Sequence, residues 1–181
     1  MTSEIIKPHS KLPQFNSTTV LIVGAEGTGK HELAKALVSV NQSGSVHVRT
    51  VSSLPLSQEH EDTRPRTDFI CFLIDLTNRR SMKTIEEAVK YVDTRYFLGR
   101  ACFTALNVKC PEKRGVDLDL LTSFCEHYQS PILYGGLEDD QQKTTLAKQV
   151  LNMAKISAGL VHNISPLLLD STKKPYDTLS I

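Results

Sequence analysis

Residues 24–37 read GAEGTGKHELAKAL and follow directly on the apolar run TVLIV at 19–23. This is the G-x-x-x-x-G-K pattern of a phosphate-binding loop, placed between a strand-like and a helix-like segment as such a loop requires. Backbone N–H groups, the helix N-terminus and the lysine ammonium converge on a phosphate in loops of this kind. The position after Lys30 normally carries a hydroxyl that ligates Mg²⁺, but here it is His31, and an imidazole is a poor ligand for a hard cation. The stretch therefore predicts the fold of a phosphate-loop protein with an impaired metal site.

Strand-like and helix-like segments alternate along the rest of the chain. Short continuous apolar runs indicate buried strands, and apolar residues spaced three and four apart indicate helices. We expect strands at 18–23, 45–51, 68–76, 101–108 and 131–134, and helices at 31–40, 82–92, 118–128 and 139–158, the last ended by Gly159. This alternation predicts an α/β fold in which helices cover both faces of a mostly parallel sheet.

The composition excludes several classes of function. The chain has 181 residues, of which 40% are hydrophobic and 23% charged, and its formal net charge of +1 gives no long-range attraction to nucleic acid or anionic lipid. The four cysteines form no C-x-x-C pair and the histidines no H-x-x-x-H pair, so we expect no metal. There is no signal-peptide core and no apolar run of about 18 residues, so we expect an intracellular, soluble protein. We divide the chain into a loosely ordered arm at 1–17, a domain at 18–160 and a tail with an apolar docking segment at 161–181.

The segment FLIDLTNRRSM at 72–82 indicates which class of phosphate-loop protein this is. It resembles the strand-to-helix segment of Ras- and Rab-like small GTPases, in which an apolar strand ends in D-x-T-N before a helix. We therefore expect a small-GTPase-like, phosphate-loop fold for 18–160. In such a protein Asp75 is structural and lies one strand beyond the magnesium site. The alternative is a Walker-B role, in which Asp75 holds magnesium in a glycine-loop ATPase or kinase.

The remaining requirements of a GTPase are not met. If 68–76 is the fourth strand of a GTPase sheet, residues 31–67 must supply helix one, both switches and two strands; they are too few, so we expect shortened or missing switch regions. No D-x-x-G occurs there, Asn107 begins NVKC in place of the base-reading N-K-x-D, and YGGLED at 134–139 replaces the S-A-K loop. Loss of a carboxylate that accepts two N–H groups of guanine costs roughly 3–6 kcal/mol, about 10²- to 10⁴-fold in affinity. We expect no catalytic residue and no bound cofactor, although the loop retains the groups that hold an anion.

Six further stretches resemble the centromere protein M family, in the right order along nearly the whole chain. They are KLP (11–13), SLPL (53–56), RPR (64–66), EEAVKYVDTRYFLGRACF (86–103), YQSPILY (128–134) and SAG (157–159). The resemblance implies a GTPase-like protein that neither binds nor hydrolyses GTP and is not an enzyme. It also implies a scaffold subunit of the inner kinetochore, in the nucleus at the centromere, which stabilises centromere protein I in a hetero-complex with centromere proteins H and K. This sequence departs from the family in keeping Gly24, Gly29 and Lys30.

Two apolar segments are candidates for contact with a partner. Tyr96, Phe97 and Leu98 end a connection between a helix and a strand, where they either plug the edge of the sheet or face a partner. Leu167 and Leu168 follow the last helix, where the tail either folds back on its own sheet or docks a helical neighbour. A scaffold role favours the use of both segments.

Other functions remain as alternatives. The first is a divergent phosphate-loop nucleotide-binding protein, an ATPase, GTPase or kinase-like module that uses Lys30 and Asp75. A Rab-like trafficking protein is another, but the sequence ends DTLSI without a prenylation cysteine. The basic stretches RPR and Lys173-Lys174 are expected to be solvated rather than to read DNA.

Overall fold

The computed structural model describes residues 5–8, 10–56, 64–108 and 111–165 and folds them around one parallel sheet in the order β2-β1-β3-β4-β5. The strands are β1 (Ser17–Gly24), β2 (Ser45–Val51), β3 (Phe69–Asp75), β4 (Ala101–Leu106) and β5 (Ile132–Gly135). The helices are α1 (Lys30–Ser39), α2 (Arg79–Ala88), α3 (Leu118–His127) and α4 (Asp140–Ser157). Short 3-10 helices cover Val89–Tyr91 (η1), Thr94–Phe97 (η2) and Pro111–Lys113 (η3).

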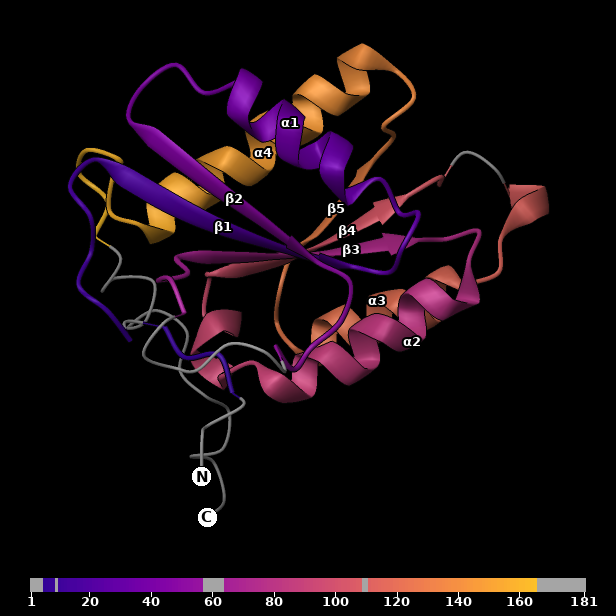
Figure 1. The fold of residues 1–181 in the computed structure, drawn as a ribbon. Coiled ribbons are helices and arrows are strands. Elements are labelled where there is room, and N and C mark those ends of the chain that lie inside the picture. The colour runs from indigo at the N-terminus through magenta and orange to yellow at the C-terminus, as the bar shows by residue number, and fades with distance from the viewer. Residues whose placement is uncertain (1–4, 9, 57–63, 109–110, 166–181) are drawn as a thin grey trace.

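Two helical layers cover the sheet, with α1 and α4 on one face and α2 and α3 on the other (Figure 1). Each layer encloses its own apolar cluster against the sheet. The inner strands β3 and β4 are buried along almost their whole length, as continuous apolar strands require. Every described strand pair is parallel, which confirms the predicted α/β fold with helices on both faces.

The described stretch between α1 and β3 contains fewer strands than the same stretch of a small GTPase requires. The described residues there hold a single strand, β2, which lies parallel to β1 at one edge of the sheet. The segment at 69–75 is therefore the third described strand of the chain, not the fourth. This agrees with the expectation that residues 31–67 are too few for both switches and two strands.

Part of the predicted arm at 1–17 is packed into the domain: Ile6 and Pro8 are buried, and Ser17 begins β1. Ile6 is 2% exposed, its N–H donates to Tyr91 O at 2.8 Å, and its carbonyl accepts from Asp93 N at 3.0 Å. The contact forms a parallel bridge with Val92 and adds Ile6 to the apolar cluster on the α2 and α3 face of the sheet. Ile5 and Ile6 form a short apolar pair in a polar segment with two prolines, which has no helical or strand periodicity, so the sequence did not predict this contact.

The ends of α4 follow from its caps. At the start, Asp139 Oδ1 accepts a hydrogen bond from Gln141 N at 3.1 Å and so satisfies one of the free N–H groups of the first turn. At the other end, Gly159 adopts a left-handed φ of 76°, and its N–H donates to Ile156 O at 3.0 Å. This confirms the glycine stop predicted from the sequence.

Tyr96 and Phe97, predicted as partner contacts, are core residues. Tyr96 is 0% exposed and its hydroxyl donates to Thr67 O at 2.9 Å; burial raises the pKa of this phenol well above its ordinary value, so it remains a neutral donor. Phe97 is 6% exposed, and its ring centroid lies 4.7 Å from that of Tyr128 and 6.1 Å from that of Phe72. Both rings are buried in the isolated chain, which favours the first of their two predicted roles, a plug at the edge of the sheet. The partner contact of this segment stays a prediction and is assigned to Leu98.

Phe97→Ala should lower the free energy of unfolding by about 3–5 kcal/mol, because it removes a ring from the interior of an aromatic cluster. Urea denaturation followed by circular dichroism measures the change. The control is Leu120→Ala on α3, where the side chain is 57% exposed and the expected change is less than about 0.5 kcal/mol. Equal stability of the two variants would mean that the Phe97 ring is not part of the core.

Candidate functional site

The phosphate-type loop lies at the carboxyl-terminal end of the sheet. β1 ends at Gly24 and α1 begins at Lys30, with the loop between them. Parallel α/β proteins bind ligands in the crevice outside the carboxyl ends of their strands. β3, β4 and β5 end on the same side, which brings Asp75, Asn107 and the segment 134–139 to the same end of the molecule as the loop.

Two glycines shape the loop. Gly27 and Gly29 have φ values of 78° and 79°, a left-handed conformation that favours glycine. Between them, Thr28 Oγ1 donates to Ala25 O at 2.8 Å and closes the turn. Leu137, from the segment after β5, lies against Gly29, where a Cβ would collide with it. The motif therefore keeps its backbone shape, with an apolar side chain packed on it.

The Lys30 ammonium is bound by the protein itself. It donates to Gly24 O at 3.2 Å, to Ala25 O at 3.3 Å and to Ser52 Oγ at 2.9 Å. The residue is 6% exposed. A lysine ammonium has three protons, so these three acceptors use all of them. A phosphate at the loop would have to replace bonds already made, which reduces the net gain from binding it.

A hollow of about 430 Å³ lies over the loop, and its charge opposes an anion. Its lining consists of Glu26, Gly27, Gly29, Lys30, His31, Glu32 and Ser52. The carboxylates of Glu26 and Glu32 outnumber the one ammonium, that of Lys30, in this lining. A triphosphate placed here would meet repulsion from both glutamates instead of the positive field of an anion site.

His31 takes the place of the magnesium-binding hydroxyl and contacts β2 instead. Its Nδ1 lies 3.3 Å from Thr50 Oγ1, and its side chain is exposed. The contact joins the first turn of α1 to the edge strand. This arrangement leaves an imidazole, not an alcohol, beside the loop.

Asp75 holds together the turn between β3 and α2. Its Oδ1 accepts hydrogen bonds from Thr77 N at 2.9 Å, from Thr77 Oγ1 at 2.7 Å and from Asn107 Nδ2 at 2.9 Å. Its own N–H donates to Ser81 Oγ at 2.8 Å. These bonds close the turn and tie the end of β3 to the end of β4. The geometry favours the structural role of Asp75 over the Walker-B role, because this oxygen already accepts three hydrogen bonds.

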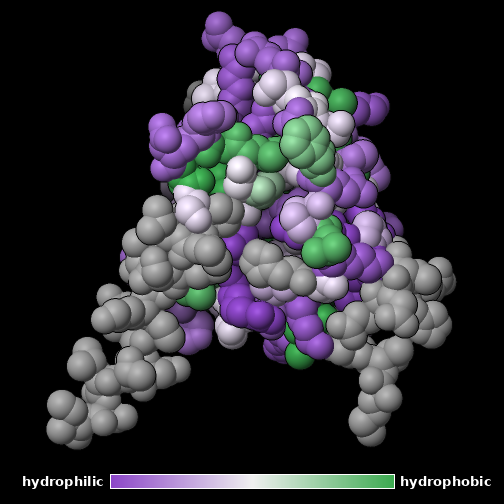
Figure 2. Space-filling view, turned by 90° about the vertical axis from the view of Figure 1, so that its left-hand side faces the viewer, coloured by the Kyte–Doolittle hydropathy of each residue, from purple (hydrophilic) through white to green (hydrophobic). Residues whose placement is uncertain are grey.

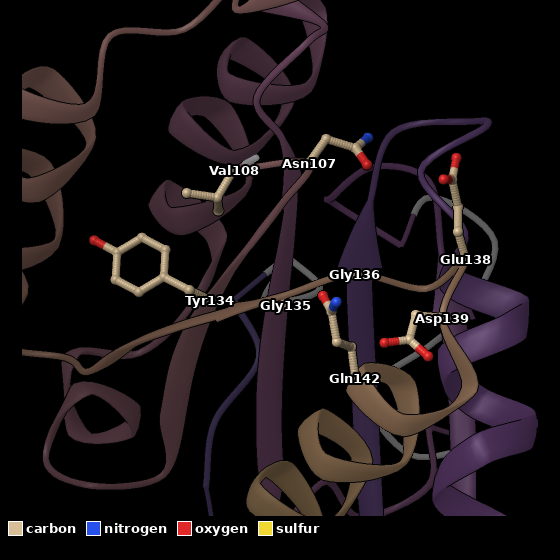
Figure 3. Close-up of a pocket in the computed structure, with 8 residues that line it drawn as sticks. All are labelled: Asn107, Val108, Tyr134, Gly135, Gly136, Glu138, Asp139 and Gln142. Carbon is tan, nitrogen blue, oxygen red and sulfur yellow. The ribbon is translucent and has the colours of Figure 1, made fainter. Parts of the chain in front are cut away.

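A second hollow, of about 320 Å³, lies at the ends of β4 and β5, where a GTPase would read its base. It is lined by Asn107, Val108, Tyr134, Gly135, Gly136, Glu138, Asp139 and Gln142. Figure 3 shows Tyr134 and Val108 on one side of it and the two carboxylates with Gln142 on the other. The carboxylates come from the segment after β5, whereas the N-K-x-D position itself carries none. The only sequence feature that could have indicated these carboxylates is the pair Glu138-Asp139 before α4. A carboxylate at this position is also typical of a helix cap, and Asp139 does cap α4.

Of the other predicted partner residues, Leu98 lies near the opposite, amino-terminal end of the sheet, where it is half-buried between η2 and β4. Leu167 and Leu168 lie outside the described residues. Arg100 donates from Nη1 to Ser157 O at 2.7 Å, at the end of α4. The segment that contains Leu98 and the end of α4 therefore lie side by side.

Neither a cluster of metal ligands nor a membrane-spanning helix occurs within 5–165, its gaps excepted. These residues bring together no group of three or more His, Cys, Asp or Glu side chains able to hold a metal ion. None of the helices described in this part of the chain is both long and apolar enough to cross a membrane.

Known proteins resemble the chain along nearly its whole length. The family model described as Centromere protein M (CENP-M) matches residues 3–176. Centromere protein M of Xenopus laevis is 33% identical over 166 residues, which cover 92% of this chain and 92% of the relative. Centromere protein M of Homo sapiens is 31% identical over 175 residues, covering 94% and 96%. That of Danio rerio is 29% identical over 168 residues, covering 93% and 90%.

Asp75→Ala should lower the free energy of unfolding by about 2–4 kcal/mol, because three donors lose an anionic acceptor. Thermal denaturation of the variant and the parent measures the difference. Glu126→Ala, which removes an exposed carboxylate on α3, is the control and should change stability by less than about 0.5 kcal/mol. An Asp75→Ala protein as stable as the control would contradict the structural role and reopen the Walker-B alternative.

Proposed function

The chain belongs to the centromere protein M family, and from that premise we propose that it is a catalytically inactive, GTPase-like scaffold subunit of the inner kinetochore. In this role it binds and stabilises centromere protein I, together with centromere proteins H and K, as a monomer within the hetero-complex. It acts in the nucleus at the centromere, in centromere assembly and chromosome segregation. Its contribution is contact with proteins, not turnover of a nucleotide.

The main support for catalytic inactivity is that the Lys30 ammonium already donates hydrogen bonds to acceptors within the chain. The ammonium that would bind phosphate is engaged by two loop carbonyls and Ser52, and two glutamates line the hollow above it. A hydrogen bond to a charged group is worth about 1.5–3 kcal/mol, so each contact withheld from a nucleotide lowers affinity by roughly tenfold or more. The missing hydroxyl at His31 withdraws a magnesium ligand as well.

The proposed partner surface lies at the amino-terminal end of the sheet. Leu98 precedes β4 there, and Leu167 and Leu168 follow the end of α4, which contacts the Leu98 segment through Arg100. Figure 2 looks onto this end and shows hydrophobic residues gathered among hydrophilic ones in the upper half of the face. Ile164, which follows α4, is 39% exposed. Large exposed apolar surfaces in soluble proteins mark sites of protein contact. These features support a scaffold that docks a helical neighbour at this end, away from the phosphate-type loop.

The alternative is a divergent nucleotide-binding protein that uses Lys30 and Asp75. Its support is the preserved backbone of the loop, with left-handed Gly27 and Gly29 before a helix N-terminus. Binding of a nucleotide would require the Lys30 ammonium to exchange its present acceptors for phosphate oxygens. Direct titration separates the two functions.

Calorimetric titration with GTP or ATP in the presence of Mg²⁺ should give no heat, and neither nucleotide should raise the melting temperature. An active small GTPase in the same titration controls for the quality of nucleotide and metal. A dissociation constant below about 10 µM would favour the alternative. Loss of that binding in Lys30→Met would then assign it to the loop.

Leu98→Glu and Leu167→Glu should each prevent co-purification with centromere proteins I, H and K while leaving the melting temperature of the isolated chain nearly unchanged. A buried interfacial charge without a partner is costly, whereas a charge that can still reach solvent, as at the half-buried Leu98 of the isolated chain, costs much less. Leu120→Glu, on the exposed face of α3, is the matched control and should leave the complex intact. A variant that melts early instead belongs to the core, and one that still co-purifies lies outside the contact.

A further inference from the structure

Ser52 lies directly beside the phosphate-type loop. It follows the last residue of β2, Val51, which pairs with Val23 of β1, and this register brings its hydroxyl to the carboxyl-terminal end of the sheet. Its Oγ lies 2.9 Å from Lys30 Nζ, and both residues line the hollow of about 430 Å³ over the loop. Ser52 is half-buried, so it borders both the loop and solvent. A group attached to this hydroxyl would therefore stand over the loop.

The loop also offers backbone donors to this hollow. α1 begins at Lys30 after Gly29, and no side chain caps this end of the helix. The N–H groups of Lys30 and His31 accordingly have no hydrogen-bond acceptor within the described residues. Both residues line the hollow, so these donors and the positive end of the helix dipole border the same space as the Ser52 hydroxyl.

A phosphoryl group on Ser52 would strengthen the hydrogen bonding of Lys30. The residue is 6% exposed, and its ammonium donates to Gly24 O, Ala25 O and Ser52 Oγ. A nucleotide from solution must displace one of these acceptors, whereas a phosphate oxygen on Ser52 takes the place of the hydroxyl of its own residue. The two carbonyl bonds are kept. A neutral acceptor becomes an anionic one, which forms a shorter and stronger hydrogen bond.

The glutamates at the hollow oppose such a group less than they oppose a free nucleotide. Glu26 and Glu32 are exposed, so water and salt screen their charges, whereas the Lys30 ammonium is buried and acts at short range. A phosphoryl group on Ser52 needs no association step, because the chain itself holds it at the loop. It carries about −1.5 to −2 charges at pH 7, fewer than the three phosphates of a nucleoside triphosphate.

We propose that Ser52 is a phosphorylation site and that the loop Gly24–Lys30 binds the phosphoryl group of its own chain. A protein kinase supplies the group from ATP: Ser52 Oγ attacks the γ-phosphorus, the bond from that phosphorus to the β–γ bridging oxygen breaks, and ADP leaves. The hydroxyl proton passes to the catalytic base of the kinase and then to water. The oxygens of the resulting phosphate ester accept from Lys30 Nζ and from the N–H groups that begin α1.

The consequence for the fold is a charged tie between two elements. The modified Ser52 joins the end of β2 to the start of α1 more firmly than the present hydroxyl does. The inference goes beyond the proposed function and does not depend on it, because a scaffold and a nucleotide-binding protein would both present Ser52 to the loop.

Phosphoserine built into the full chain in place of Ser52 tests the loop as a receptor, and phosphoserine in place of Ser53 is the matched control. Ser53 is the next residue along the chain and is exposed. At pH 7.5 and low salt, the chain modified at 52 should melt about 3 °C above the unmodified chain, because the phosphate gains its new bonds only in the folded state. The chain modified at 53 should melt within about 1 °C of the unmodified chain.

Phosphorus-31 NMR identifies the group that holds the phosphate. Beside the ammonium, the second pKa of the phosphate at 52 should fall below about 5.5, whereas that of the phosphate at 53 should stay near its ordinary value of about 6. Lys30→Met should return the first pKa to about 6, and Lys35→Met, at an exposed position of α1, should not. His31 and both glutamates of the hollow remain in these variants, so the return is due to the lost ammonium. The comparison of 52 with 53 in the parent chain does not require the Lys30 variant to fold.

Mass spectrometry of the chain expressed in cultured human cells tests the modification itself and should find phosphate on Ser52. Equal phosphate pKa values at 52 and 53, or a chain modified at 52 that melts below the unmodified chain, would overturn the loop as a receptor. Detection of the peptide that contains Ser52 only in its unmodified form would overturn the phosphorylation site.

Discussion

Burial of β3 and β4 on both faces is the constraint from which the arrangement follows. Strands that are apolar on both sides need a helical layer above and below them, and parallel neighbours need a crossover between each strand and the next. The carboxyl ends of all five strands then meet on one side of the molecule. The loop after β1, Asp75 after β3 and Asn107 after β4 share that side for this reason alone. Their proximity is a property of the fold and would exist without any ligand.

The pairing register of β1 with β2 explains how the phosphate-type loop binds its own lysine. Val23 pairs with Val51, so the residue after β2, Ser52, stands beside the residue after Val23 in β1, Gly24. A hydroxyl at this point meets the Lys30 ammonium at 2.9 Å and completes its hydrogen bonding. A buried ammonium without acceptors would be costly, so the two loop carbonyls and Ser52 allow the chain to keep a buried lysine here without a phosphate. The retained lysine is therefore evidence about folding and not by itself about nucleotide binding.

The sequence predicted what depends on periodicity and missed what depends on contacts between distant segments. Each predicted strand overlaps an observed one, and Gly159 ends α4 as expected, because buried strands and glycine stops have local signatures. The sequence did not decide whether Tyr96 and Phe97 lie in the core or at the surface, because a short 3-10 helix has no repeating pattern that shows which side is buried. Ser52 as an acceptor for Lys30 had no local signal at all, because only the pairing of β1 with β2 brings it there. The carboxylates beside Asn107 were missed for the same reason.

The shortness of residues 31–67 connects the absence of switch motifs in the sequence with the position of β2 at the boundary of the sheet. This stretch contains no D-x-x-G, and its described part holds one strand, β2, which pairs with β1 alone among the described strands. A regular seven-residue edge strand without proline invites pairing, and natural proteins cover or blunt such edges. Arg49 adds charge to this edge, which disfavours pairing with a second copy of the same strand. The length of this one stretch therefore accounts both for the missing switch motif and for a strand at the boundary of the described sheet.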